Sequence, residues 1–241
     1  MDSTKLIYPE DMQKLTHETC VMGISEEDGK TVVLLDETIF YPQGGGQPYD
    51  QGVIENESGK FIVEEVRFVD GVVRHIGHFE KGSFSTGQEV ALKVDPERRA
   101  LHARLHSAGH VLDMAVNELG LPWIPGKGYH FPDGPYIEYD GSFEEAEKEN
   151  LQKQIESAAN KFIAAGIQTS IQFMPKSEMH KVCANVPDYL PEGKPARVVL
   201  YGTFGVPCGG THVANLKDIG HLMIRKISNK KGLIRVGYDV T

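Results

Sequence analysis

The sequence predicts an α+β protein: a small N-terminal β-barrel followed by a two-layer α/β domain in which helices pack on a largely antiparallel sheet. Two observations support this prediction. Residues 1–94 contain short apolar runs broken by turn signals, which is typical of short strands that close into a barrel. At Asp95 the pattern changes to helical periodicity, and helical and strand-like segments are mixed from there onward. We therefore expect two domains, residues 1–94 and residues 95–241.

The barrel strands are predicted from five apolar runs and the turns between them. Asp28 with Gly29, and Asp70 with Gly71, each separate two runs, and Asp-Gly is a favoured dipeptide for two-residue hairpin turns. The five runs are TCVMGI, TVVLLD, FIVEEVRFV, VVRHIGHF and EVALKV.

The second domain is predicted to open with a long helix. Asp95 is a good N-cap, and Pro96 suits the first helical position. Apolar residues recur at three- and four-residue steps from there to Leu119, and Gly120 can end the helix. The following segment, WIPGKGYHFPDG, is rich in glycine and proline, so we expect a loop.

The remaining elements follow from capping signals and strand-like runs. A strand is expected at PYIEYDG, and Ser142 with Glu145 predicts a capping box for a second helix that ends near Gly166. The segment SNKKG is a plausible hairpin turn between the last two strands. The later strands are expected at QTSIQFM, ARVVLYG, HLMIRKI and LIRVGYDV.

Composition limits the classes of protein to consider. No apolar run reaches 18 residues and the N-terminal MDSTKLIYPEDM lacks an apolar core, so we expect neither a membrane helix nor a secretory signal. Cys20, Cys183 and Cys208 include no CxxC pair, which favours a reducing, cytoplasmic setting over a disulfide framework. The net charge of −9 argues against a protein that simply coats nucleic acid, although an acidic protein can still carry a local basic patch.

Two short motifs carry metal-ligand chemistry. His106 and His110, in HSAGH, are four residues apart on a predicted helix, so both imidazoles can reach one point. Cys208 and His212, in PCGGTH, offer a thiolate and a third imidazole. Either pair alone could be ordinary, as surface histidines or a buried structural cysteine, but the two together predict a zinc site. His102 is a competing ligand one turn before His106.

Two further features leave alternatives open. His130 is either near this site or an ordinary loop histidine. The segment TIFYPQGGGQPYDQG contains three successive glycines, Gly44, Gly45 and Gly46, whose bare backbone can approach a ligand closely. No GK[ST] follows, so the segment is not a P-loop, and the alternative is a mobile connector. HSAGH also lacks the glutamate of HExxH, which disfavours a peptidase.

Three stretches together resemble a known family. FYPQGGGQPYDQG, the helix around HSAGH, and CGGTH followed by DIGHLMIRKI are similar to the editing region of alanyl-tRNA synthetases, and most similar to the free-standing AlaX editing proteins. The resemblance covers residues from about 15 to 240. The chain departs from the synthetases after HSAGH, where PGKGYHFPDG stands in place of a QxGS-like stretch.

The resemblance implies a fold and a site. The fold would be a translation-protein-like β-barrel followed by an editing domain of the threonyl/alanyl-tRNA synthetase type. The zinc ligands would be His106, His110, Cys208 and His212. The glycine segment would lie against the substrate, which makes Gly44, Gly45, Gly46 and Gln47 the candidate substrate-binding residues.

The expected function is therefore trans-editing. The chain would be a zinc-dependent aminoacyl-tRNA deacylase that hydrolyses mischarged tRNA(Ala), chiefly seryl-tRNA(Ala) with glycyl-tRNA(Ala) as a second substrate. Two alternatives remain: a non-catalytic, zinc-stabilised RNA-binding module, and a metallohydrolase of small esters or amides. The sequence names no general base. Candidate RNA contacts are Arg98, Arg99, Arg104, Arg225, Lys226, Lys230, Lys231 and Arg235.

Overall fold

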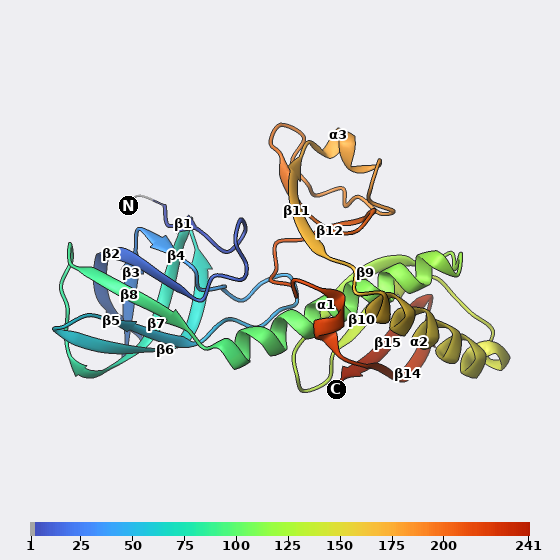
Figure 1. Cartoon of the computed structure of the whole chain (residues 1–241), viewed down its shortest axis with the longest axis horizontal. Coiled ribbons are helices and arrows are strands. Elements are labelled where there is room, and N and C mark those ends of the chain that lie inside the picture. The colour runs from blue at the N-terminus through green and yellow to red at the C-terminus, as the bar shows by residue number, and fades with distance from the viewer. Residues whose placement is uncertain (1–2) are drawn as a thin grey trace. The chain divides into compact units, whose positions relative to one another are not determined.

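The computed structural model describes residues 3–241, which form two compact units that divide between Leu101 and His102 (Figure 1). The sequence placed the boundary at residue 95, at the start of the first helix. The difference arises because the first turn of that helix, α1 (Pro96–Glu118), is bonded to the first unit, as described below. Within residues 3–241, no helix is both long and apolar enough to span a membrane.

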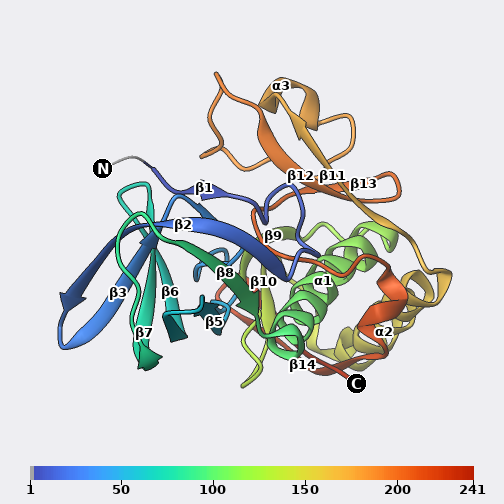
Figure 2. The ribbon, with the colours of Figure 1, turned by 60° about the vertical axis from the view of Figure 1, so that its left-hand side comes forward.

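The first unit is a closed β-barrel with strand order β2-β3-β7-β6-β5-β8, and its strands can be followed in Figure 2 from blue to green. A short parallel pair, β1 with β4, accompanies the barrel. The predicted barrel is thus confirmed. Its elements are β1 (Lys5–Leu6), β2 (Thr16–Glu27), β3 (Lys30–Leu35), β4 (Glu37–Thr38), β5 (Gly52–Glu55), β6 (Gly59–Val69), β7 (Val72–Gly82) and β8 (Glu89–Val94).

Both predicted Asp-Gly turns are present. Asp28 and Gly29 connect β2 to β3, with φ of 51° and 76°, and Asp70 and Gly71 connect β6 to β7, with φ of 52° and 82°. Two-residue hairpins of the kind that matches strand twist require positive φ at both positions, and Asp and Gly are among the residues that accept it.

The three glycines lie in a tight turn. Gly44 and Gln47 exchange both backbone hydrogen bonds, at 3.2 and 2.8 Å, and Gly45 and Gly46 between them have φ of 53° and 77°. The hydroxyl of Tyr41 donates to the Gly44 carbonyl at 2.9 Å. Positive φ accounts for two of the three glycines. Gly44 and Gly45 are exposed, whereas the Gln47 side chain is fully buried.

A buried ion pair holds the start of α1 in the first unit. Asp95 caps the helix by accepting from the N–H groups of Glu97 and Arg98, as predicted. The guanidinium of Arg99 lies against the carboxylate of Asp50, and both side chains are 5% exposed or less. Arg99 also donates to the carbonyls of Met12 at 2.9 Å and Ile39 at 2.8 Å, and Asp50 accepts from the Tyr41 N–H. This network makes Arg99 a structural residue, so its candidacy as an RNA contact was wrong.

The second unit contains a four-stranded antiparallel sheet of order β14-β15-β10-β9, and α1 and α2 pack on one face of it (Figure 1). The predicted α+β class is confirmed. The elements of this unit after α1 are β9 (Ile124–Tyr129), β10 (Tyr136–Asp140), η1 (Glu145–Glu147), α2 (Lys148–Ala165), β11 (Thr169–Met174), α3 (Lys176–Met179), β12 (Ala196–Tyr201), β13 (Phe204–Pro207), η2 (Leu216–Ile219), β14 (Leu222–Lys230) and β15 (Leu233–Val240).

Two local predictions for this unit were wrong. The segment expected to be a loop after α1 contains β9, because pairing with β10 supplies backbone hydrogen bonds that local glycine and proline signals do not reveal. The second helix begins at Lys148, after the 3₁₀ turn η1, and no side chain caps it. Its C-terminus is as expected, with Gly166 in the left-handed region at φ 66°.

Three of the later strands form a sheet of their own. β11, β12 and β13 pair in that order and, with α3, enclose a small core of Met179, Cys183, Val198 and Leu200. This layer stands apart from the four-stranded sheet in both ribbon views (Figures 1 and 2). The chain from β13 leads directly into CGGTH, so this sheet positions the second metal-ligand motif.

The Arg99–Asp50 pair gives the first prediction. Arg99→Met leaves a buried carboxylate without its cation, and breaking a buried pair on one side typically costs about 3–5 kcal/mol. We expect the barrel to lose about 3 kcal/mol of unfolding free energy in urea denaturation. The matched control is Arg98→Met, since Arg98 is only partly buried, where a loss under about 1 kcal/mol is expected. Equal losses in the two variants would contradict this account.

Candidate metal centre

Helix α1 presents two imidazoles on one face. His106 and His110 are one helical turn apart, both are buried, and their ring centroids are 5.0 Å apart. Residues four apart share a helix face, so this arrangement follows from the helical periodicity of the segment.

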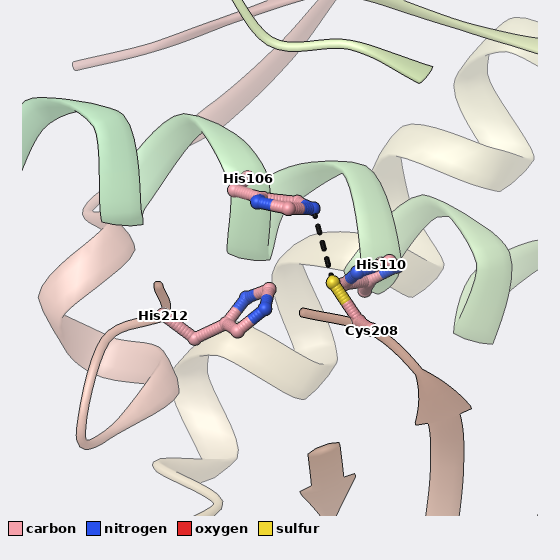
Figure 3. A group of neighbouring side chains, drawn as sticks. All are labelled: His106, His110, Cys208 and His212. Atoms are coloured by element: carbon pink, nitrogen blue, oxygen red, sulfur yellow. Dashed lines mark hydrogen bonds between the residues drawn. The ribbon is translucent and has the colours of Figure 1, made fainter. Parts of the chain in front are cut away.

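The loop after β13 supplies the other two side chains, and a buried arginine shapes it. Arg197, in β12, donates to the carbonyls of Cys208 at 2.6 Å and Gly210 at 2.9 Å, and its own carbonyl accepts from the Cys208 N–H. These bonds hold the Cys-Gly-Gly backbone in place, so that Cys208 and His212 point toward α1 (Figure 3).

The four side chains meet at one point. One ligand atom from each of His106, His110, Cys208 and His212 lies within 4.8 Å of the other three, and Figure 3 shows all four converging. The Cys208 Sγ and His106 Nε2 are 3.4 Å apart. These are the four residues that the sequence spacing grouped, and the group could hold a metal ion.

Hydrogen bonds to the far ring nitrogens fix two of the imidazoles. The Nδ1 of His110 lies 3.2 Å from Asp113, whose other oxygen accepts from the Tyr139 hydroxyl at 2.9 Å. The Nδ1 of His212 lies 3.0 Å from the Tyr201 hydroxyl and 3.3 Å from Ser107 Oγ. In metal sites such partners set the tautomer and leave the other nitrogen to the metal.

The electrostatics of His106, His212 and Cys208 favour their metal-binding forms. Burial lowers the pKa of His106 and of His212 well below the usual range, so both imidazoles are neutral. Burial raises the pKa of the Cys208 thiol, but nearby His110, the Gly210 N–H and Arg197 outweigh it, so the net effect is a lowered pKa. A lowered thiol pKa favours the thiolate, which is the form that binds metals. For His110, burial lowers the pKa but Asp113 and Cys208 outweigh it and raise the pKa to about 10, so metal binding there must release a proton.

Two observations indicate that these residues fit a zinc ion. His110 Nε2 is buried and has no hydrogen-bond partner among the described residues, which is costly unless a ligand completes the site. One thiolate and three imidazoles are also a donor set that zinc prefers, and zinc-bound donors at about 2.0–2.3 Å from the ion lie about 3.5 Å apart. The ligand atoms of the four side chains lie within 4.8 Å of one another, which exceeds this spacing by about 1.3 Å at most.

His130 belongs to the site, and His102 does not join the group of four. The ring of His130 stacks on His106 with centroids 4.3 Å apart, and its Nδ1 lies 2.7 Å from the Tyr238 hydroxyl, which donates to the Leu105 carbonyl. Burial lowers the pKa of His130 to about 3, so the ring is neutral. His102 is buried one turn earlier on α1.

Two glycines make the slot in which His130 lies. A Cβ atom on Gly109 would come within 2.5 Å of His130 Cε1, and one on Gly128 would come within 2.5 Å of His130 Nε2. The glycine in HSAGH and the second glycine in PGKGYH thus leave room for the same ring. By contrast, a Cβ on Gly209, in CGGTH, would meet nothing within 4 Å.

Comparisons with known proteins match both units. The family model described as tRNA synthetases class II (A) matches residues 7–98, and that of the threonyl and alanyl tRNA synthetase second additional domain matches residues 196–236. The alanyl-tRNA editing protein AlaX-M of Pyrococcus horikoshii is 31% identical over 235 residues, which is 95% of this chain and 94% of the relative. The chain belongs to the AlaX family of alanyl-tRNA editing proteins.

The AlaX-family chain also resembles much longer proteins. The alanine–tRNA ligase of Methanothrix thermoacetophila is 34% identical over 86% of this chain, and that of Methanobrevibacter smithii is 30% identical over 98%. The chain spans only 22% and 27% of the length of these two ligases.

Several supporting residues of the AlaX-family site were not found from the sequence. Asp113 follows His110 by three residues on α1, and that spacing could have identified it as a partner of the imidazole. Arg197, Ser107 and Tyr201 carried no signal, because only the fold brings them to the ligands.

Most of the basic residues proposed for RNA have other partners in the described chain. Arg98 lies over the ring of Tyr49, and Arg104 donates to the Ile219 carbonyl. Arg225 pairs with Asp239, and Arg235 pairs with Glu138. Within residues 3–241, the side chains of the exposed Lys226, Lys230 and Lys231 form no ion pair or hydrogen bond.

The slot around His130 predicts that a Gly→Ala substitution in α1 will lower stability, which is opposite to its usual effect in a helix. Alanine is normally the better helix former by about 1 kcal/mol, so Gly→Ala within α1 should stabilise where space allows. We expect Gly109→Ala to destabilise instead, by about 1–3 kcal/mol in thermal and urea unfolding, because its Cβ displaces His130. Zinc affinity, measured against a chelator, should fall about tenfold or more as His106 loses its stacking partner.

Two variants control this experiment. Gly209→Ala has free space and should leave stability and zinc affinity unchanged. In a His130→Ala background, adding Gly109→Ala should cost little further stability, since the ring that it would strike is absent. A Gly109→Ala protein as stable as the parent would show that His130 is not confined as described.

Proposed function

We propose that this chain hydrolyses the ester of seryl-tRNA(Ala), with glycyl-tRNA(Ala) as a second substrate, and spares correctly charged alanyl-tRNA(Ala). As a member of the AlaX family, it is an editing hydrolase of the aminoacyl-tRNA deacylase class. The observation that carries the proposal is the match to AlaX-M over 94% of that relative, in a chain whose HSAGH and CGGTH side chains converge.

The chemistry of amino-acid selection explains why such an enzyme is needed. A pocket built for alanine cannot strongly exclude glycine, which lacks one methyl group, or serine, which adds one hydroxyl; such discrimination reaches roughly 10–200-fold. A second site that hydrogen-bonds the serine hydroxyl can spare alanine, because alanine would leave that polar group unpaired. A separate editing site therefore supplies the missing selectivity.

We further propose that the metal is zinc and that His106, His110, Cys208 and His212 hold it. The donor set and the lone His110 Nε2 support this choice. Zinc bound there would supply a fixed positive charge close to the substrate. Asp113 and Tyr201 would orient His110 and His212, and His130 would orient His106. Four protein donors fill a tetrahedral site, so water activation is not assigned to the metal.

The glycine turn is proposed as a second substrate contact. Gly44 and Gly45 expose their backbone at its tip, and bare backbone allows close approach of a ligand. The Gln47 side chain is buried, and its backbone N–H closes the turn by donating to Gly44, so we assign Gln47 the role of shaping the turn.

The proposed substrate and the cysteine usage together favour a cytoplasmic location. One alternative function has a specific observation in its favour. A fully ligated zinc site is also what a non-catalytic, zinc-stabilised RNA-binding module would contain.

The proposal predicts selective release of serine. Under single-turnover conditions, purified protein should release labelled serine from seryl-tRNA(Ala) faster than alanine from alanyl-tRNA(Ala), by a factor on the order of 10²–10⁴. Seryl-tRNA(Thr) should be a poorer substrate. If alanine is released as fast as serine, the editing proposal fails. If tRNA binds and nothing is released, the RNA-binding alternative replaces it.

Two variants locate the activity in the same assay. Cys208→Ala should abolish serine release, because it removes one of the four donors. Gly44→Val should slow release while leaving the fold intact, since the new Cβ would meet only ordinary contacts, the nearest at 3.8 Å from the Tyr41 hydroxyl. Unchanged release by Gly44→Val at normal stability would show that the turn does not contact substrate.

A further inference from the structure

The four-stranded sheet of the second unit has an open face. α1 and α2 cover one side, where apolar side chains such as Ile137, Val236 and Tyr238 are buried. Side chains alternate along each strand, so the neighbouring positions point the other way. On that side the register aligns Lys226, Gly237, Tyr136 and Tyr129 in one row across all four strands.

Three aromatic rings and a guanidinium form a continuous stack on this open face. Phe131 stacks on Tyr129 with centroids 4.5 Å apart and planes 15° apart, and Tyr129 stacks on Tyr136 at 5.2 Å and 18°. The guanidinium of Arg235 lies 4.0 Å from the centroid of the Tyr136 ring and is held by Glu138 at 2.6 Å. We call these four residues, Phe131, Tyr129, Tyr136 and Arg235, the aromatic column.

The column is held in place and open to solvent. The hydroxyl of Tyr129 donates to Asp133 at 3.0 Å, and the pairing of Arg235 with Glu138 fixes the other end. All three rings are only partly buried, so part of each ring is accessible to solvent. Within residues 3–241, Phe131 has a single ring contact, with Tyr129, so the stack can be extended at Phe131.

Positive charge accompanies the column. Lys226 lies in the same cross-strand row as Tyr136, and Lys230 and Lys231 lie at the tip of the β14–β15 hairpin. All three lysines are exposed and without ion pairs among the described residues, on a chain whose net charge is −9. Unpaired lysines on an acidic protein favour a polyanion at this face.

The column is built on the segment that also supports the metal centre. Tyr129 and Phe131 lie on either side of His130 in sequence, and His130 is buried against His106 while its two neighbours are partly exposed. The two sites therefore share one segment of backbone, with the metal centre on its inner side and the aromatic column on its outer side.

We propose that the open face of this sheet binds the tRNA substrate, with an unpaired nucleobase stacked on the aromatic column at Phe131 and nearby phosphates bound by Lys226, Lys230 and Lys231. Partly exposed aromatic side chains beside an arginine and free lysines are the combination that stacks unpaired bases and neutralises phosphates. This inference rests on the proposed function for the identity of the RNA.

Binding of uncharged tRNA(Ala) tests the proposal independently of hydrolysis. Phe131→Leu should raise the dissociation constant about fivefold or more, which is the usual effect of losing one base–aromatic stack. Phe131→Trp should retain affinity, and its added tryptophan emission should be quenched when tRNA binds, since Trp123, the only other tryptophan, is 5% exposed. Lys226→Gln should weaken binding and reduce the slope of log affinity against log salt by about one.

The matched control is Phe173, which is 51% exposed on the separate three-stranded sheet. Phe173→Leu should leave binding unchanged, and emission from Phe173→Trp should not be quenched by tRNA. Normal affinity in a folded Phe131→Leu protein, or an equal loss in Phe173→Leu, would overturn the proposal. So would a change in sedimentation showing that the column mediates self-association. Column-dependent binding without serine release would leave this inference standing and reject the proposed function.

Discussion

The candidate metal centre depends on four donor atoms, from segments 102 residues apart in sequence, being held within 4.8 Å of one another. Two imidazoles come from α1 without difficulty, because one helix face presents both. The other two donors, Cys208 and His212, lie on a loop, whose backbone needs further hydrogen bonds to keep both side chains directed at α1. Arg197 provides these by binding two carbonyls of that loop, while Asp113 and Tyr201 fix the ring orientations.

The same requirement explains local sequence that would otherwise look arbitrary. The glycine in HSAGH costs helix stability, and a Cβ there would strike His130. The segment PGKGYH, where the resemblance to the synthetases led us to expect a QxGS-like stretch, supplies both His130 and the second glycine of its slot. The differing segment therefore carries a side chain that stacks on a candidate metal ligand, with the aromatic column on its outer side.

Sequence reasoning succeeded where the signal is local. The two Asp-Gly turns and the Asp95 cap follow from dihedral preference and capping, and the shared helix face of His106 and His110 follows from their spacing. HSAGH and CGGTH were grouped by ligand type and by the family resemblance, and the fold brings their side chains together. Sequence reasoning failed where partners distant in sequence decide the outcome. β9 exists because β10 pairs with it, and β11, β12 and β13 form a separate sheet that no local pattern distinguishes from the larger one. Arg99 was expected to be an exposed basic residue, because the sequence does not reveal that it is buried beside Asp50.

The central claim is that one sulfur and three nitrogens bind a single zinc ion, and X-ray absorption at the zinc edge tests it directly. Protein purified without added metal should contain one zinc per chain. Its spectrum should fit one sulfur at about 2.3 Å and three nitrogens at about 2.0 Å. A spectrum without sulfur, or one dominated by oxygen ligands, would contradict the account, because Cys208 would then not be bound to the metal.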